Sequence, residues 1–528
     1  MKRGSYDVAE YIHDPGYDIR KTSIRSNGMD AGDYVGSKGK EEEEEELVLD
    51  EEISLHGINW IICAVMIVGD MAGGGVIALP SALLDSGLYP GIAMILISAL
   101  MSGYTGVQLG DNWIMMQKRW SEYRHVCRKP YPEMGYRALG KGGRILVSII
   151  MSVQQFGLSV VFLLLAANNL TSFFFAFWGL KINFCITACA VALFVTPFLW
   201  LGSAKDFWQA GVIACFSTTI AVCLLIVGAA LDAPTCLNEV DYPSLKFNEF
   251  FLSYGTIMFS YGGHSVFPSF QHDMKKPNEF AKSVCLGYTA IVIMYLPISI
   301  LGYIVYGGSL TGSIIPSVQT TWMQQTANIL ITIHAIFTQL IVCTPLSLQL
   351  EDIFRVPNRF GPARVLLRSV MVLCALFVAL SIPKFSVILD LIGGTTITSL
   401  TMLLPAIFYM FLVAGARKRE VMIANGTLRP DEEDHVYASV ADVFRYNKWY
   451  IILVNICILA FGAIGGVAST LSAVDELANT SWDLPCYVAV FEGGIDVTGQ
   501  GGAACCGKFF NVTVGDEDPH KFCQVYSS

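Results

Sequence analysis

Long apolar runs separated by short polar segments make up most of this chain. Each run has about 20 residues or more, the length that an α-helix needs to cross roughly 30 Å of hydrocarbon. Polar and apolar positions do not alternate with a period of two, so we expect helices rather than a β-barrel. The sequence predicts eleven transmembrane helices, at residues 57–84, 90–115, 143–168, 183–202, 206–231, 249–270, 282–306, 321–350, 365–382, 385–414 and 448–473.

The composition agrees with an all-α integral membrane protein. Of the 528 residues, 53% are hydrophobic and 15% are charged, whereas a soluble domain has roughly 25% charged residues. Much of the net charge of -10 comes from residues 1–55, which hold 15 acidic and 7 basic side chains. The run from Glu41 to Glu46 repels itself and disfavours folding. We therefore expect a disordered acidic tail at 1–53, an eleven-helix domain at 54–474, and a cysteine-containing tail at 475–528.

The distribution of Lys and Arg predicts the orientation of the chain. With a cytosolic N-terminus, the segments on the cytosolic side of the eleven helices hold 29 of the 34 basic residues, and the other side holds five. Basic residues are strongly enriched on the cytosolic side of membrane proteins. We therefore expect a cytosolic N-terminus and, because eleven is odd, an extracellular or luminal C-terminus. The plasma membrane and endolysosomal or vesicular membranes all fit this topology.

Several cysteines fall on the predicted extracellular or luminal side, where disulfides form. The disulfide candidates are Cys236, Cys486, Cys505, Cys506 and Cys523, and their pairing is not defined by the sequence. Because five is odd, at least one of them stays free or pairs elsewhere. Two N-glycosylation sequons, at Asn479 and Asn511, lie on the same side. The spacing of potential ligands predicts no metal site.

Glycines and prolines interrupt two of the predicted helices. The first helix contains three consecutive glycines at residues 73–75, followed by Pro80, and each glycine destabilises a helix by about 1 kcal/mol. The sixth contains a glycine pair before His264, followed by Pro268. Close helix packing through small residues would explain one such segment. Two of them, five helices apart, indicate unwound segments whose free backbone groups bind a ligand.

Paired interruptions also predict how the helices are organised. Helices 1 to 5 and 6 to 10 would form two repeats of inverted topology, with helix 11 as an addition. Unwound backbone at membrane depth is tolerated only beside protein or a water-filled cavity. We therefore expect a cavity between the first and sixth helices.

Three segments resemble the amino acid/auxin permease family, and within it the vesicular and vacuolar branches and the proton-assisted transporters. They are the glycine-rich segment 73–80, the segment 262–268 followed by 274–280, and the segment 391–405 of the tenth helix. The resemblance covers residues 54–474 and neither tail. It implies a five-plus-five inverted-repeat (LeuT-like) fold in which helices 1 and 6 are broken. It also implies a secondary active transporter of amino acids, with coupling to protons.

The same resemblance implies where the substrate binds. Its carboxylate would lie on the free amides of residues 73–75, and its ammonium against carbonyl groups freed at residues 259–261. The residues that we expect at the substrate are Asp70, Gly73, Gly74, Gly75, Phe259, Ser260, Tyr261 and Gly262. Tyr261 is the aromatic residue expected to line the pocket. Asp70 departs from the family pattern, which has a small neutral residue here in many members.

Titratable residues within the predicted helices are candidates for proton coupling. Asp70 is a carboxylate at bilayer depth, where an unpaired charge costs several kcal/mol, so we expect it to take up a proton or to pair with an amine of the substrate. A structural role, with hydrogen bonds to nearby unwound backbone, is the alternative. His264 lies in the second break, and histidine titrates near neutrality. His334 and Asp390 are further candidates, although no break surrounds His334. Sodium coupling through backbone carbonyls and helix 8 hydroxyls is the alternative to protons, and no other cofactor is expected.

Other function classes have less support. An amino acid sensor that signals through its acidic N-terminal tail is the main alternative, and the tail could bind cytosolic partners. An ion channel is disfavoured by the paired breaks. The chain has no hydrolase elbow, phosphate loop or metal-ligand cluster, so we do not expect an enzyme. The expected partners are a small, neutral amino acid and the lipid bilayer, with no nucleic acid.

Overall fold

The computed structural model describes residues 57–124, 127, 129–180, 182–201, 208–357, 359–429, 432, 434–479, 485–488 and 505–514. The chain divides into two units, Met1–Leu55 and His56–Ser528. The predicted acidic tail at 1–53 lies outside the described residues, and every element named below belongs to the second unit. That unit is helical where it is described, with β pairing there limited to two isolated bridges.

The helices follow the predicted apolar runs. They are α2 (Trp60–Met71), α3 (Gly74–Ser86), α4 (Leu88–Arg119), α5 (Pro130–Trp178), α6 (Phe184–Leu201), α7 (Trp208–Cys236), α8 (Phe247–Ser260), α9 (Phe267–His272), α10 (Phe280–Tyr306), α11 (Thr321–Ile353), α12 (Pro362–Ser381), α13 (Phe385–Ile392), α14 (Leu404–Ala424), α15 (Val440–Tyr446) and α16 (Trp449–Asn479). Each of the eleven runs falls on one helix or on consecutive helices in this series.

Helix length and apolarity account for fewer membrane spans than the eleven that the sequence predicts. Within the described residues, 8 helices are long and apolar enough to cross a membrane, or up to 9 if the bent pair α2 and α3 is one span. Eleven spans would also require α6 and the pair α8 and α9. Of these, α6 is a shorter apolar helix, and α8 ends six residues before α9 begins. The count of eleven and the inverted repeat therefore stay predictions.

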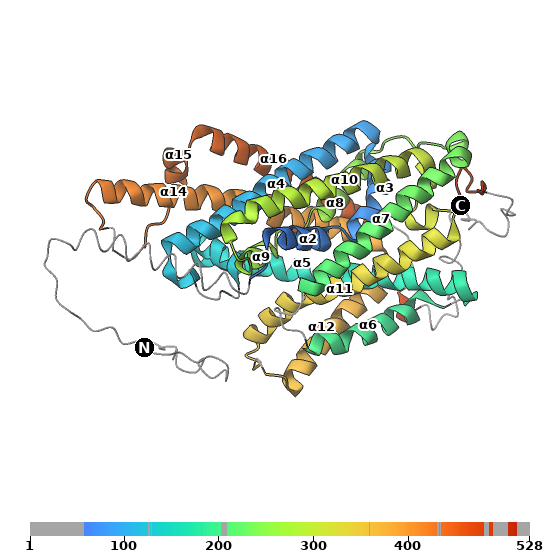
Figure 1. The fold of residues 1–528 in the computed structure, drawn as a ribbon, viewed down its shortest axis with the longest axis horizontal. Helices are drawn as coiled ribbons and strands as arrows, with labels where there is room; N and C mark the ends of the chain where they lie inside the picture. The colour runs from blue at the N-terminus through green and yellow to red at the C-terminus, as the bar shows by residue number, and fades with distance from the viewer. Residues whose placement is uncertain are drawn as a thin grey trace. The chain divides into compact units, whose positions relative to one another are not determined.

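The long helices pack side by side and surround the two short pairs (Figure 1). Helix α11 packs against both α5 and α7, and α10 packs against α2 and α3. Helix α3 in turn packs against α8, which also contacts α16. The α2–α3 pair is therefore in contact with the α8–α9 pair, and longer helices pack around both pairs.

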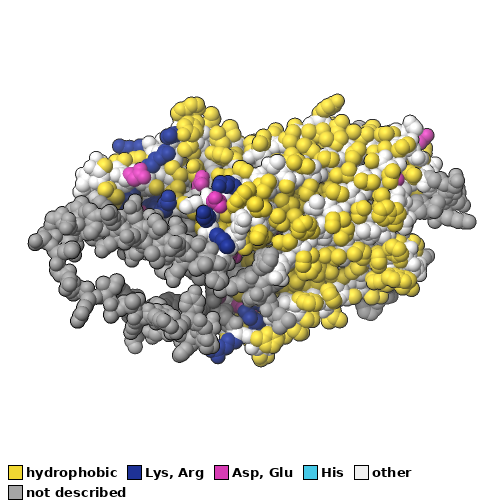
Figure 2. All heavy atoms as spheres, in the orientation of Figure 1, with side chains coloured by type: hydrophobic (Ala, Val, Ile, Leu, Met, Phe, Trp, Pro, Cys, Tyr) yellow, Lys and Arg dark blue, Asp and Glu magenta, His cyan; other side chains and the backbone are white. Residues whose placement is uncertain are grey.

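The outer surface of these helices is strongly apolar. Figure 2 shows a broad band of hydrophobic side chains, with Lys and Arg gathered towards one end, near α14 and α15. Large side chains point outward from several helices, and Leu100, Leu193 and Ile464 are 74%, 76% and 68% exposed. An apolar surface of this extent suits lipid rather than water. The family resemblance and this surface agree on a multi-pass membrane protein.

Two helices are less regular than the sequence predicts. The predicted helix at 385–414 has π-helical stretches at Gly393–Ile397 and Ser399–Leu403 between α13 and α14. A Cβ on Gly393 would lie 2.0 Å from the carbonyl oxygen of Gly255, so this stretch contacts α8 backbone to backbone. Helix α5 begins before its predicted run and is kinked at Gly140, where φ is 74°.

Two disulfides fix the C-terminal region to the helices. Cys236, at the end of α7, is bonded to Cys506, and Cys185 of α6 is bonded to Cys486. Cys185 was not among the predicted candidates, because it lies within an apolar run where cysteine serves as a small hydrophobic residue. With Cys185 included, the candidate cysteines number six, so an odd one is no longer left over. Of the other candidates, Cys505 is fully buried and Cys523 lies outside the described residues.

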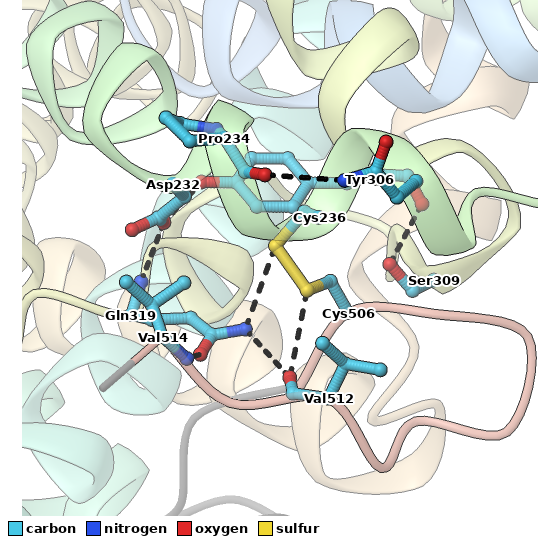
Figure 3. The surroundings of a disulfide bond; sticks show 10 residues. Asp232, Pro234, Cys236, Tyr306, Ser309, Gln319, Cys506, Val512 and Val514 are labelled. Carbon is cyan, nitrogen blue, oxygen red and sulfur yellow. Dashed lines mark hydrogen bonds between the residues drawn. A yellow bond between two sulfur atoms is a disulfide. The ribbon is translucent and has the colours of Figure 1, made fainter. Parts of the chain in front are cut away.

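Hydrogen bonds reinforce the first of these disulfides (Figure 3). The side-chain amide of Gln319 donates to the carbonyl oxygen of Val512 over 3.1 Å, and the Val514 amide donates to the Gln319 oxygen over 2.7 Å. Asp232 accepts from the Gln319 backbone amide. The C-terminal segment is thereby joined both to α7 and to the segment before α11. Of the two predicted glycosylation sites, Asn511 is exposed on this segment and Asn479 is the last residue of α16.

Candidate functional site

The first helix break separates α2 from α3. The two helices are bent by 56° at a break between Met71 and Gly74. The amide of Ala72 donates back to Val68 over 2.8 Å and that of Gly73 to Met71 over 3.1 Å. No side chain caps the N-terminus of α3. The first amides of α3 therefore present the positive end of a helix dipole in the middle of the protein.

Glycine is required at this break because other helices approach its backbone closely. A Cβ on Gly73 would lie 2.0 Å from Nε2 of His334, and a Cβ on Gly75 would lie 2.4 Å from Oγ of Ser260. The first contact comes from α11 and the second from α8. Two glycines predicted to bind substrate are therefore also packing positions, Gly73 against α11 and Gly75 against α8.

The second break differs from its predicted form. Helix α8 ends at Ser260 and α9 begins at Phe267. Between them, Gly262 donates to the Phe259 carbonyl and Gly263 donates to the Tyr261 carbonyl, each over 3.1 Å. The carbonyl groups that we expected to be free for a substrate ammonium are thus already acceptors. Tight turns satisfy buried carbonyl groups without a ligand, so the expectation of free carbonyls here was wrong.

Tyr295 of α10 connects the two breaks. Its hydroxyl lies 2.8 Å from the carbonyl oxygen of Ser260 and 3.1 Å from that of Met71. These are the last residues of α8 and α2. Tyr295 was not predicted from the sequence, although a buried tyrosine in an apolar helix has a hydroxyl that needs a partner. The single O–H proton is shared between the two carbonyl oxygens, so this hydroxyl holds the ends of both half-helices at one point.

A small cavity lies between the two breaks, with a volume of about 20 Å³. Its walls are residues of both breaks together with one face of α5 and one of α11: Asp70, Met71, Gly73, Gly74, Gln155, Leu158, Phe162, Phe259, Gly262, Ser265, Val266, Thr338 and Val342. A space of this size holds about one water molecule. Of the predicted substrate residues, Asp70, Gly73, Gly74, Phe259 and Gly262 line this cavity.

Asp70 is the one acidic residue in the cavity wall. It is the second-last residue of α2 and is half-buried. Its carboxylate has no hydrogen-bond or ion-pair partner among the described residues. The alternative of a structural carboxylate bonded to nearby unwound backbone therefore has no contact to support it. Because the C-terminus of a helix is the negative end of its dipole, Asp70 adds a charge of the same sign there. This arrangement favours a cationic group in the cavity.

Gln155 of α5 is a cavity residue that the sequence analysis missed. It is only 2% exposed, and neither its amide nitrogen nor its carbonyl oxygen has a partner among the described residues. A glutamine in an apolar run has no sequence signal that separates a ligand-binding role from helix packing. Its unsatisfied state becomes visible only in three dimensions.

His334 lies directly against the first break. Its Nδ1 is 2.9 Å from the hydroxyl of Thr218, and its Nε2 is 3.2 Å from that of Thr338, which lines the cavity. No helix break was predicted from the sequence around this residue. The structure corrects that expectation, because α11 carries His334 to the backbone of Gly73.

The other predicted residues lie away from the cavity wall. His264 is buried against α4, with Nε2 at 3.2 Å from Thr105 Oγ1, and its ring is stacked on Phe267. Tyr261 is fully buried beside two tyrosines of α10 and does not line the cavity as expected. Asp390 of α13 accepts a hydrogen bond from Thr256 of α8. Ser260 and Gly75 form the contact between α8 and α3 described above.

The site has no arrangement typical of a metal centre. Across the residues that the structure describes, no group of three or more His, Cys, Asp and Glu side chains could hold a metal ion. Asp70 is instead surrounded by apolar residues, glycines and uncharged polar groups. The arrangement suits a small ligand that carries both a positive charge for Asp70 and a negative charge for the α3 N-terminus.

Known proteins with similar structures support the fold. A crystal structure of MhsT in complex with L-phenylalanine superposes with a TM-score of 0.50 and covers 79% of this chain and 99% of that one. The two sequences are 12% identical, so the likeness concerns the fold alone. It supports an all-helical fold for this chain.

Sequence comparisons identify the family. The chain is 26% identical to amino acid transporter AVT1B of Arabidopsis thaliana, over 66% of this chain and 63% of that protein. It is 24% identical to lysine histidine transporter-like 1 of the same organism, over 75% of this chain and 85% of that protein. Residues 56–423 match the family model of the transmembrane amino acid transporter protein. The chain therefore belongs to the transmembrane amino acid transporter family.

Proposed function

We propose that this protein is a secondary active transporter of small, neutral amino acids that works by alternating access around the cavity between its two helix breaks. The observation that carries the proposal is the unpartnered carboxylate of Asp70, which faces that cavity two residues before the break. Family membership and the transporter names of the relatives support the same activity. Nothing in the cavity suits bond-breaking chemistry.

The two charges of an amino acid match the two helix ends at the first break. The N-terminus of α3, with no side-chain cap, favours the substrate carboxylate because its first amides lack intrahelical partners. Asp70 at the end of α2 would bind the ammonium. This assignment replaces the carbonyl groups at residues 259–261, which are occupied by turns and by Tyr295.

Transport requires this site to open on either side in turn. A cavity of about 20 Å³ cannot hold an amino acid, so the surrounding helices must move apart. On one side, the Ile58 amide donates to the Asp273 carbonyl over 2.9 Å and joins the start of α2 to the end of α9. On the other, the Ile314 amide donates to Ile77 of α3 over 3.0 Å. We propose that these two contacts break alternately.

Proton coupling is the second part of the proposal. Asp70 faces the cavity, and His334 contacts both the break backbone at Gly73 and the cavity residue Thr338. These two groups could gain or lose a proton as the site opens. Sodium coupling through the hydroxyls of α11 is the alternative, and of the three candidate ligands Thr332, Thr338 and Thr344, Thr338 lines the cavity.

We also propose the orientation given by the basic residues. Lys and Arg gather near α14 and α15 (Figure 2), in the loops assigned to the cytosol. The Cys185–Cys486 and Cys236–Cys506 disulfides each involve the C-terminal region assigned to the far side. An oxidising exterior or lumen is where such bonds persist. A plasma, endolysosomal or vesicular membrane meets this requirement.

Uptake into proteoliposomes tests the proposal. The purified protein would be reconstituted and given a panel of radiolabelled amino acids, with and without an inward proton gradient. We expect saturable uptake of small neutral amino acids that the gradient stimulates. Uptake that ignores the gradient would remove proton coupling and keep the transporter. Ligand-dependent thermal stabilisation without any flux would instead support the sensor, and deletion of residues 1–53 would then show whether its output depends on the tail.

A further inference from the structure

One face of α5 forms a wall of the cavity. Gln155, Leu158 and Phe162 all line it, and their spacing of three and four residues places them on the same side of the helix. Leu158 and Phe162 are apolar. Gln155 is therefore the one polar group that α5 presents to the cavity.

The amide of Gln155 is unsatisfied in a buried position. The side chain is 2% exposed, and both its nitrogen and its oxygen lack a partner among the described residues. A buried donor or acceptor without a partner costs about 1–3 kcal/mol. Native proteins keep few such groups, and each one calls for an explanation.

Neighbouring polar groups on α5 and α11 do not supply that partner. Ser159 of α5 accepts a hydrogen bond from Gln339 over 2.7 Å. Thr338 of α11 is engaged with His334. The open direction for Gln155 is the cavity, where it lies with Asp70 and the start of α3.

We propose that Gln155 determines substrate specificity by binding a hydroxyl or carboxamide group on the side chain of the transported amino acid. The inference rests on the proposed transport function and narrows its substrate class. A glutamine amide offers two donors and two acceptor lone pairs, so it matches a group that both donates and accepts. Hydroxyl and carboxamide side chains, as in serine, threonine and asparagine, meet this requirement.

Charge in the cavity argues for the same class. The cavity wall holds one carboxylate, that of Asp70, and the ammonium of the substrate would balance it. A second charge on the substrate side chain would be buried without a counter-charge, which is strongly unfavourable. An apolar side chain would leave both amide atoms of Gln155 unsatisfied. A neutral, hydrogen-bonding side chain avoids both penalties.

The test compares amino acids of nearly the same shape. Uptake of threonine against valine, and of asparagine against leucine, would be measured for the wild type, Gln155→Leu and Gln154→Leu. Gln154 is the matched control, because it is buried on the same helix and does not line the cavity. We expect the wild type to prefer the polar member of each pair. Gln155→Leu should reduce that preference by about tenfold, the equivalent of about 1.4 kcal/mol, whereas Gln154→Leu should keep it.

Preference ratios separate recognition from folding, since both substrates use the same preparation. A wild type that transports valine as well as threonine, and leucine as well as asparagine, overturns the inference without any variant. So does a Gln155→Leu protein that slows every substrate equally, because that result indicates a structural role. Absence of all amino acid uptake by the wild type is a different outcome, which contradicts the proposed function itself.

Discussion

The two helix breaks look alike in sequence and differ in chemistry. Each places glycines before a proline within an apolar run. The first break leaves Asp70 without a partner and α3 without a side-chain cap. Backbone turns occupy carbonyl groups at both breaks, and in the second break Nε2 of the histidine is also bonded to α4. The first break therefore offers charge to a ligand, and the second offers mainly shape.

This difference shows that an interrupted helix does not by itself make a binding site. A break binds a ligand only where its polar groups stay unsatisfied within the fold, since tight turns otherwise consume them. The inverted-repeat hypothesis gives the two breaks equivalent positions. Their hydrogen bonds give them unequal roles, and the following predictions test that inequality.

Alanine substitution of one glycine in each break should give the largest difference in uptake between the two breaks. Gly73→Ala would force a Cβ to 2.0 Å from the His334 ring, whereas a Cβ on Gly262 would lie 2.8 Å from Cγ2 of Ile397, which is a milder overlap. Overpacking costs about 1–3 kcal/mol, and at Gly73 it also displaces the N-terminus of α3. We expect Gly73→Ala to lose nearly all uptake and Gly262→Ala to keep a large part.

The cause of this contrast can be checked directly. Initial uptake rates would be normalised to monodisperse protein, and His334→Ala would be added to Gly73→Ala. If the collision with the ring is the reason, the double variant should regain part of the stability lost by Gly73→Ala, measured by thermal unfolding. Equal losses at Gly73 and Gly262 would contradict the unequal roles of the breaks.

Neutralising the carboxylates of Asp70 and Asp390 should give the next largest difference between the two breaks. Asp70→Asn keeps the shape but removes the charge that we assign to the substrate ammonium, and loss of one partner of a buried charge pair costs about 2–5 kcal/mol. We expect its KM to rise tenfold or more and its response to a proton gradient to change. Asp390→Asn removes a carboxylate that accepts from Thr256 on the α8 side, and its KM should stay near that of the wild type. A wild-type KM and gradient response in Asp70→Asn would remove both roles from this residue.

Substitution of His334 and His264 should give a difference of intermediate size in the pH dependence of uptake. His334→Gln alters a group in contact with the first break and with Thr338, so we expect the pH dependence of uptake to flatten. His264→Gln changes a side chain packed on Phe267 and α4, and it should lower stability while leaving the pH profile in place. Uptake rates from pH 5 to 8, together with melting temperatures, would distinguish the two. A flattened profile in His264→Gln alone would move proton coupling to the second break.

Much of this architecture could be predicted because membrane spanning imposes simple sequence rules. Long apolar runs and consecutive glycines are local signals, so the helices could be predicted, as could a break that the structure places between Met71 and Gly74. The roles of Gln155, Tyr295 and Cys185 could not be found in the same way. An uncharged polar residue or a cysteine in an apolar run is usually part of the packing, and only contacts between distant segments reveal the exceptions. The role of His334 was underestimated for the same reason, because its contacts with Thr218 and Gly73 come from other helices.

The π-helical stretches show a second limit of the sequence. Residues 385–414 form one apolar run, and nothing in its periodicity indicates that Gly393–Ile397 is π-helical. The cause is tertiary, because the backbone of Gly393 is pressed against that of Gly255 in α8. The sequence pattern of a single helix carries no information about such contacts between helices.

Tyr295→Phe should give the smallest effect and tests whether the two breaks act together. The substitution removes one hydroxyl, which bonds to the last carbonyl of α2 and of α8. One such hydrogen bond contributes about 1 kcal/mol, so we expect a modest loss of thermal stability and a few-fold change in uptake rate. Because the hydroxyl joins both half-helices, combining Tyr295→Phe with Asp70→Asn should give less than the sum of the separate free-energy changes in uptake. Strict additivity in this double-mutant cycle would mean that each break moves on its own, and that the tyrosine serves only to satisfy two buried carbonyl groups.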